Sequence, residues 1–306
     1  MSSKVPRYPI LLSIAAALVT MGIKFSAYWM TGSVSLFSDA LESLINLVAA
    51  LTALFCLWFA AQPVDSTHTY GHEKIEYFSS GLEGMLILFA AAGIAWHAVS
   101  RLLQPQELEA LEIGGALSFL ASLINLAVAQ VLLRVGKRSR SILLEADGKH
   151  LMTDVWTSFA VIGGLALVRV TSWHILDPII ALLVAGMIVW TAGDLIRRSF
   201  NGLMDHALPL DEQAAVRAAI EPLLLPGMHY HALRTRQAGA RRFVDFHLLV
   251  PGGWTVQAAH DLGEKIEAAI QHALPGAEIT VHVEPVEAQS SWHDSALLPV
   301  ENNDKP

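Results

Sequence analysis

Six long apolar stretches occupy the first 200 residues, and they constrain the fold more than any other feature of the chain. They run over residues 9–30, 34–61, 76–103, 112–135, 141–170 and 175–200. Each is long enough to cross the hydrocarbon core of a bilayer, which takes about 20 apolar residues. The whole chain is 53% hydrophobic and only 16% charged, whereas a soluble domain carries about 25% charged residues. The sequence therefore predicts an α-helical membrane protein with six transmembrane helices.

The basic residues near the ends of these stretches predict the orientation in the membrane. One side collects Lys4, Arg7, Lys74, Arg134, Lys137, Arg138, Arg140, Arg197 and Arg198. The other side has only Arg101 and Arg169. Because cytoplasmic loops are enriched in Lys and Arg, we expect a multi-pass protein of the cell inner membrane with both termini in the cytoplasm.

The composition changes after Asn201, where polar residues become frequent. The pattern predicts helices over 211–225 and 255–273 and strands over 229–237, 242–250 and 278–283. An α-β-β-α-β order suits a small two-layer α/β domain. We therefore expect a transmembrane domain over 1–204, a cytoplasmic domain over 205–286 and a disordered polar tail over 287–306.

Charge and cysteine content exclude several kinds of site. The net charge of −8 argues against a nucleic-acid partner, which would favour a basic patch. Cys56 is the only cysteine, so the chain can form neither an internal disulfide nor a thiolate cluster. Any metal site must use His, Asp, Glu or Asn.

Polar residues recur at helical spacing inside two of the apolar stretches. Glu42 and Asn46 are four residues apart in the second stretch, and His150 and Asp154 are four apart in the fifth. Residues at this spacing share one face of a helix. Two such faces opposed would give four N and O ligands, which suit Zn²⁺ and also serve Fe²⁺ or Mn²⁺. A simple interhelical hydrogen bond stays open as an alternative for Asn46.

Other charged residues in the apolar stretches have simpler interpretations. We expect Asp39 to be structural, near a helix start that follows Thr31-Gly32-Ser33. Lys24 and Glu83 are predicted to pair with neighbours or to extend toward the membrane surface.

Two polar segments outside the apolar stretches could also bind metal. Asp65, His68 and His72 lie between the second and third stretches at spacings of three and four residues. They predict either a shallower metal site or a solvated loop. The C-terminal domain adds a set that favours metal binding over scattered surface histidines: His229, His231, His247, His260, His282 and Glu284.

Several segments together resemble the cation diffusion facilitator (cation efflux) family, in particular bacterial zinc and iron exporters. The resemblance extends from the first helix to about Pro285. It is carried by the segments Thr31–Leu36, Tyr70–His72, His150–Asp154, Asp205–Pro209 and Leu233–Gln237.

The resemblance implies a homodimer of six-helix subunits with a ferredoxin-like cytoplasmic domain. It implies a transport site at Glu42, Asn46, His150 and Asp154, a loop site at Asp65, His68 and His72, and a cytoplasmic site at His231, His247, His260, His282 and Glu284. It also implies that Lys74 and Asp205 form a charged pair joining the two domains. Zn²⁺ would be both the cargo and a regulatory ligand.

The second helix departs from the usual pattern of the family, which is His-x-x-x-Asp or Asp-x-x-x-Asp. The corresponding residues here are Glu42 and Asn46. Since an amide replaces a carboxylate, the site has one negative charge fewer. Zinc stays the first choice of metal, with iron and manganese open.

These features predict a metal/proton antiporter and not an enzyme. Metal ligands must lose their protons to bind, and histidine is the side chain whose ordinary pKa lies nearest neutrality. We therefore expect His150, with Asp154, to carry the exchanged proton. A membrane-anchored metal sensor or scaffold without transport is the alternative. A metabolite carrier is less well supported, because few Arg or aromatic groups are expected at mid-membrane.

Overall fold

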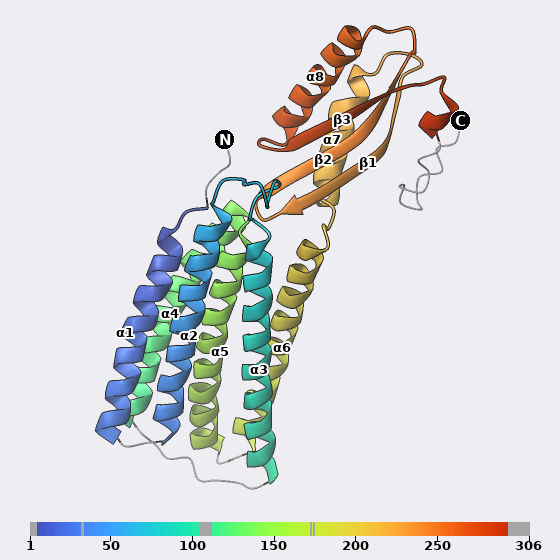
Figure 1. The fold of residues 1–306 in the computed structure, drawn as a ribbon. Coiled ribbons are helices and arrows are strands. Elements are labelled where there is room, and N and C mark those ends of the chain that lie inside the picture. The colour runs from blue at the N-terminus through green and yellow to red at the C-terminus, as the bar shows by residue number, and fades with distance from the viewer. Residues whose placement is uncertain (1–4, 32–33, 104–111, 172, 174, 293–306) are drawn as a thin grey trace. The chain divides into compact units, whose positions relative to one another are not determined.

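The chain forms two compact units, one ending at Leu203 and the other beginning at Met204 (Figure 1). The computed structural model describes residues 5–31, 34–103, 112–171, 173 and 175–292. Some helical side chains, including those of Asp39 and Glu42, also lie outside the described part. We call the two parts the membrane unit and the sheet unit.

Six helices of 24 to 30 residues build the membrane unit. They are α1 (Tyr8–Thr31), α2 (Val34–Ala60), α3 (Ile75–Leu103), α4 (Glu112–Ser139), α5 (Ile142–Thr171) and α6 (Leu176–Leu203). Figure 1 shows them side by side as a bundle. Helices that are far apart in the sequence also pack together: α3 packs against α6, and α1 packs against α4.

Four described helical stretches are long and apolar enough to cross a membrane. These are Tyr8–Ser26, Ile75–Ser100, Phe119–Ser139 and Pro178–Leu203, in α1, α3, α4 and α6. The described part of α2 contributes a shorter apolar stretch, Asn46–Ala60, and α5 carries several charged residues. For α2 and α5, spanning the membrane stays a prediction.

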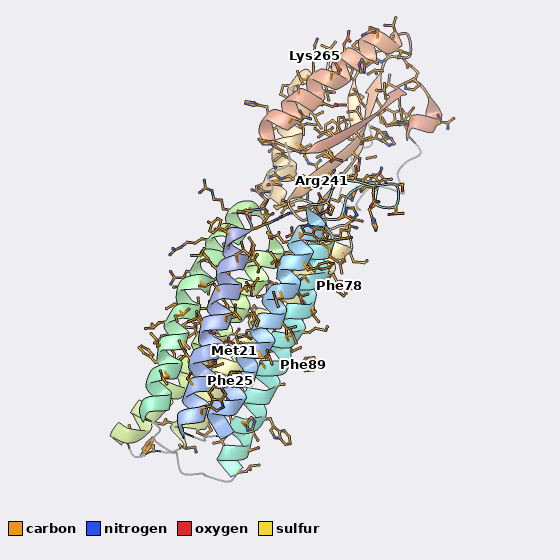
Figure 2. The ribbon with its side chains drawn as sticks, turned by 60° about the vertical axis from the view of Figure 1, so that its left-hand side comes forward. Met21, Phe25, Phe78, Phe89, Arg241 and Lys265 are labelled. Carbon is orange, nitrogen blue, oxygen red and sulfur yellow. The ribbon has the colours of Figure 1, made fainter. Side chains whose placement is uncertain are left out.

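Large apolar side chains cover the outside of the membrane unit. Leu183, Trp190 and Phe89 are more than two-thirds exposed, and Phe78 and Phe89 project away from the bundle in Figure 2. The interior of the unit holds two apolar clusters and many buried polar residues: Ser13, Lys24, Asn46, Glu76, Glu83, Asn125, Glu145, Asp147, His150 and Asp154. Because charged groups are costly within a membrane, such buried residues are candidates for function.

Polar contacts join three helices at one end of the bundle. Ser141, just before α5, donates a hydrogen bond to the Glu76 carboxylate near the start of α3 (2.6 Å). Ser199, near the end of α6, donates to the backbone carbonyl of Tyr77. The starts of α3 and α5 therefore lie at the same end as the end of α6.

The sheet unit has the predicted α-β-β-α-β order. Its elements are α7 (Leu210–Ile220), β1 (His229–Ala238), β2 (Arg241–Val250), α8 (Val256–Ala273) and β3 (Glu278–Pro285). The strand order is β1-β2-β3, with β1 antiparallel and β3 parallel to β2. The first helix ends earlier than expected, at Ile220, and a 3₁₀ turn over Glu221–Leu223 follows. Pro222 explains the change, because proline has no backbone N–H to donate the next α-helical hydrogen bond.

Both helices of the sheet unit cover one face of the sheet. Ile220 of α7 and Ile266 of α8 share a buried core with Val244, Phe246 and Leu248 of β2. Side chains alternate between the two faces of a strand, so His247 points to the opposite face. That face is where the histidines of this unit come together.

A short 3₁₀ helix, Gln289–Trp292, follows β3. It lies within the stretch that we expected to be disordered. Its Trp292 indole donates a hydrogen bond to the Val286 carbonyl (2.9 Å). Residues 293–306 lie outside the described part of the chain.

Candidate metal centres

Asn46 of α2 connects two polar residues of α5 inside the membrane unit. Its Nδ2 donates to Asp154 Oδ2 at 2.5 Å, and its Oδ1 lies 2.6 Å from His150 Nε2. All three side chains are buried, with exposed fractions of 5 to 7%. Three of the four predicted transport-site residues therefore form one cluster, and the side chain of Glu42 lies outside the described part.

The hydrogen bonds indicate where the protons of this cluster lie. An amide oxygen can only accept a hydrogen bond, so the short contact places a proton on His150 Nε2. The amide NH₂ group then serves Asp154. A metal bound through His150 Nε2 would have to displace that proton.

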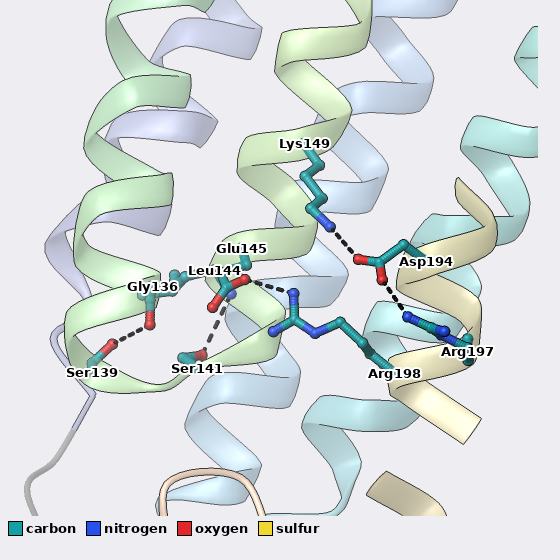
Figure 3. Close-up of polar contacts among 9 residues, drawn as sticks. All are labelled: Gly136, Ser139, Ser141, Leu144, Glu145, Lys149, Asp194, Arg197 and Arg198. Carbon is teal, nitrogen blue, oxygen red and sulfur yellow. Dashed lines mark hydrogen bonds and ion pairs between the residues drawn. The ribbon is translucent and has the colours of Figure 1, made fainter. Parts of the chain in front are cut away.

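Ion pairs flank this cluster and tie α5 to α6 (Figure 3). Lys149 Nζ contacts Asp194 at 3.0 Å, and Arg198 contacts Glu145 at 2.8 Å. Arg197 adds a second contact to Asp194 at 3.2 Å. Sequence reasoning missed these pairs, although Glu145 and Lys149 are four residues apart, as are Asp194 and Arg198. Each helix carries an acidic residue followed four residues later by a basic one, and this pattern could have predicted the two ion pairs.

Asp65, His68 and His72 form a second cluster, in the loop between α2 and α3. One ligand atom from each lies within 4.8 Å of the others. His72 Nε2 is 3.2 Å and His68 Nδ1 is 3.4 Å from the Asp65 carboxylate. His72 is buried, and its ring packs edge-on against Phe59. Three ligands at this spacing leave a fourth tetrahedral position open.

The Asp65 carboxylate is held in its ionised form by the loop itself. Its Oδ1 accepts hydrogen bonds from the Thr67 hydroxyl (2.8 Å), the His68 amide (2.7 Å) and the Thr67 amide (2.8 Å). These hydrogen bonds lower the pKa of Asp65 far below its usual value. The ligand therefore requires no deprotonation before it binds a cation.

A row of three histidines crosses the open face of the sheet unit. His231 of β1 pairs in register with His247 of β2, and His247 pairs with His282 of β3. Their neighbouring rings are 5.1 Å and 4.8 Å apart between centroids. Directly opposed residues on neighbouring strands share a face, so the register of the sheet brings these imidazoles together.

Glu284, near the end of β3, contacts all three histidines of the row. Its Oε2 lies 3.1 Å from His231 Nε2 and 3.4 Å from His247 Nδ1, and its Oε1 lies 3.4 Å from His282 Nε2. His231, His247 and Glu284 offer ligand atoms within 4.8 Å of one another. This arrangement can hold one cation with imidazole and carboxylate ligands.

His260 does not join this row within one chain. It is largely exposed on α8 and lies 3.5 Å from Glu264, one turn further along the helix. Because α8 covers the other face of the sheet, His260 does not reach the row within one chain, and its place in a cytoplasmic site at a dimer interface stays a prediction. Trp292, which sequence reasoning missed, instead packs beside the row, 6.2 Å from the His231 ring.

Two other predictions concern charged residues outside these clusters. Lys74 Nζ lies 3.5 Å from the Leu203 carbonyl, and Asp205 pairs with Arg236 at 3.3 Å. Since Lys74 and Asp205 belong to different units, their pairing stays a prediction. Glu83 was predicted to pair or to extend to the surface. This was wrong, because it is buried and neither carboxylate oxygen has a hydrogen-bond partner among the described residues.

Known proteins match both units. Residues 10–204 match the cation efflux transmembrane domain, and residues 208–286 match the cytoplasmic domain of cation efflux proteins. The chain is 48% identical over 309 residues to an uncharacterized transporter of Synechocystis sp., covering 100% of both proteins. It is 33% identical over 293 residues to the cation-efflux pump FieF of Pectobacterium carotovorum, covering 92% of this chain and 96% of that pump.

A solved structure of the putative zinc transporter CzrB, in its zinc form, is 40% identical to this chain. The match covers 26% of this chain and 92% of the CzrB chain, with a TM-score of 0.25. The two domain matches cover most of the sequence and agree with the polar interior of the membrane unit. The chain therefore belongs to the cation diffusion facilitator family, and it is a multi-pass membrane transporter for the efflux of divalent metal ions rather than an enzyme.

Proposed function

We propose that this protein exports divalent transition-metal ions from the cytoplasm in exchange for protons, with Zn²⁺ as the first choice of cargo. The observation that carries the proposal is the buried cluster of Asn46, His150 and Asp154. It joins two helices within the membrane unit through contacts of 2.5 and 2.6 Å. We place Glu42 as its fourth ligand from the sequence pattern.

Exchange of metal for protons is derived from the hydrogen bonds of this cluster. The Nε2 proton of His150 is held by Asn46, and Asp154 accepts from the same amide. Metal binding through Nε2 requires both hydrogen bonds to break and the proton to leave that nitrogen. A doubly protonated His150 then releases one proton, whereas a neutral His150 keeps its proton on Nδ1. Return of a proton restores the hydrogen-bonded cluster, which favours release of the metal. His150 and Asp154 are therefore the proposed coupling residues.

The ligand set supports zinc without excluding two other metals. One imidazole with oxygen ligands suits tetrahedral Zn²⁺, and the same donors bind Fe²⁺ and Mn²⁺. The amide in place of a carboxylate lowers the negative charge of the site. It also removes a repulsion that two carboxylates would suffer when empty. We therefore expect moderate affinity and easy release.

The direction of transport rests on the positions of the basic residues. Arg134, Lys137 and Arg138 lie at the end of α4, and Arg197 and Arg198 lie near the end of α6. The end of α6 meets the starts of α3 and α5. By the positive-inside rule this end faces the cytoplasm, which supports an inner-membrane protein with both termini inside. Alternating access would then carry the metal outward.

We infer that the two outer clusters sense metal rather than transport it. They comprise Asp65, His68 and His72 in the loop, and His231, His247, His282 and Glu284 on the sheet. The sheet cluster is open on one side, so a second copy of the chain could complete it. In that arrangement, His260 would act from the partner subunit of a homodimer.

Counterflow in proteoliposomes tests the proposal. Purified protein is reconstituted, loaded with Zn²⁺, Fe²⁺ or Mn²⁺, and followed for exchange of a labelled ion. A transporter exchanges at least one of these metals, and zinc should exchange fastest. A sensor or scaffold would bind metal without any exchange, and this result would refute the proposal.

A further inference from the structure

Two more carboxylates, Glu83 of α3 and Asp147 of α5, lie buried in the membrane unit outside the proposed transport site. Their exposed fractions are 3% and 2%. Neither oxygen of Glu83 has a hydrogen-bond partner among the described residues, and neither does Asp147 Oδ2. Burying a carboxylate without a partner is costly. Three unpartnered oxygens in one bundle therefore require an explanation.

The two carboxylates lie at the same depth on neighbouring helices. The hydrogen bond between Ser141 and Glu76 aligns the starts of α5 and α3. Glu83 follows Glu76 by seven residues and Asp147 follows Ser141 by six, or about 10 Å and 9 Å along the two helices. The helices pack against each other, so the two buried carboxylates lie at one level of the contact between α3 and α5.

The surroundings of the pair favour a bound cation. Asp147 shares one face of α5 with His150 and Asp154, which follow it by three and seven residues. Asp154 is a third acidic group, so the region carries an excess of negative charge. Like charges held together at low dielectric strongly oppose ionisation, and a cation bound between them removes the conflict.

We propose that Glu83 and Asp147 form a second binding site for a divalent transition-metal ion. Carboxylate oxygens are suitable ligands for Mn²⁺, Fe²⁺ and Zn²⁺. A site with carboxylates and no imidazole holds zinc less tightly than one that includes histidine. The site is thus suited to rapid exchange of the ion rather than to storage.

The position of the site gives it a place on the ion's path. Asp147 precedes His150 by three residues, or about 4.5 Å along α5. It lies on the side where α3 and α5 begin, which is the proposed cytoplasmic end. An exported ion would reach Glu83 and Asp147 first and then pass to His150 and Asp154. This order rests on the proposed function, whereas the existence of the site does not.

Counting bound metal tests the site directly. Full-length protein in lipid nanodiscs is dialysed against labelled Zn²⁺, and bound ions are counted per chain. Glu83→Gln and Asp147→Asn should each lose one ion. Glu76→Gln is the matched control, because Glu76 is an equally buried carboxylate of α3 that accepts a hydrogen bond from Ser141. This control should keep the full number of ions.

The same count is repeated in a His150→Ala/Asp154→Asn background. If the proposed transport site is wrong, this background binds as many ions as the wild type, but adding Glu83→Gln still removes one. The two proposals can therefore fail independently.

Folding of each variant is checked by size-exclusion chromatography. If Glu83→Gln does not fold, Asp147→Asn and Glu83→Asp decide the matter. Glu83→Asp keeps the charge and should bind the ion with lower affinity. If every folded variant binds the wild-type number of ions at saturation, the pair carries protons only and the proposal is wrong.

Discussion

The buried cluster of the membrane unit and the histidine row of the sheet unit use similar side chains in opposite settings. In the first, Asn46 joins His150 and Asp154 by two short hydrogen bonds inside a helical bundle. In the second, His231 and His247 stand on paired strands around the single carboxylate of Glu284. The first cluster must give up two short hydrogen bonds to bind a metal, whereas the second must give up the single one between His231 and Glu284.

This difference shows how one chain can both move and detect a metal. Helices can shift relative to one another, and contacts between α2 and α5 can break and re-form during transport. Neighbouring strands are joined by a ladder of backbone hydrogen bonds, so the spacing of the histidine row is maintained. We therefore expect changes in the two clusters to affect different measurements.

Removing one carboxylate from each cluster should have the largest effect on this comparison. Asp154→Ala removes a proposed transport ligand and the partner of Asn46. We expect transport to fall by more than about a hundredfold, because loss of even outer-shell partners of metal ligands costs 10–100-fold. Glu284→Ala is the matched variant and should retain turnover at saturating metal. Equal loss in both variants, measured as zinc flux in proteoliposomes, would show that the clusters do not have separate roles.

Restoring the missing charge should give the next largest effect. Asn46→Asp adds a carboxylate beside Asp154, so zinc should bind about tenfold more tightly, or ~1.4 kcal/mol. Turnover should slow because release becomes harder. Asn125→Asp on α4 is the control, since Asn125 is also a buried asparagine of the bundle. Unchanged or weaker zinc affinity for Asn46→Asp, measured by equilibrium dialysis, would contradict our account of the amide.

The centre of the histidine row provides a smaller and more local effect. His247→Ala should lower metal affinity at the sheet cluster by at least about tenfold, because His247 lies between both neighbours. His260→Ala should have a weaker effect, since His260 is outside the row within one chain. Transport at saturating metal should be preserved in both variants. A turnover loss in His247→Ala as large as in Asp154→Ala would contradict a sensing role.

The loop cluster adds a test in which the effect of a mutation on metal binding is compared at two pH values. Hydrogen bonds lower the pKa of Asp65, so the stabilisation of the loop by its carboxylate is present above the ordinary carboxyl range. It is lost only in strong acid, as pH falls through the lowered pKa. Asp65→Asn should therefore weaken metal binding by the same factor at pH 7 and pH 5.5. A factor that shrinks at pH 5.5 would mean that Asp65 is partly protonated there.

Local periodicity was sufficient to predict some of the site. His150 and Asp154 are one helical turn apart, so their common face follows from the sequence alone. The same holds for the ligand spacing in the loop and for the order of elements in the sheet unit. These features depend on residues that are close in sequence.

Tertiary packing determines what the sequence could not show. The histidine row requires the register of β1, β2 and β3, and the parallel pairing of β3 is set after a long helical connection. The depth match of Glu83 and Asp147 depends on how α3 and α5 align. The hydrogen bond between Trp292 and Val286 requires the chain to fold back after β3. Each depends on contacts between segments whose relative placement no local pattern specifies.

Simultaneous measurement of zinc and proton flux is the most direct test of the central claim. Liposomes containing the wild-type protein carry a zinc indicator and a pH indicator inside. Our account predicts that zinc entry is accompanied by proton exit in a fixed ratio, and that both fluxes disappear in His150→Ala. Zinc entry at the same rate without a pH change, or an unaltered ratio in His150→Ala, would contradict exchange of the metal for the His150 proton.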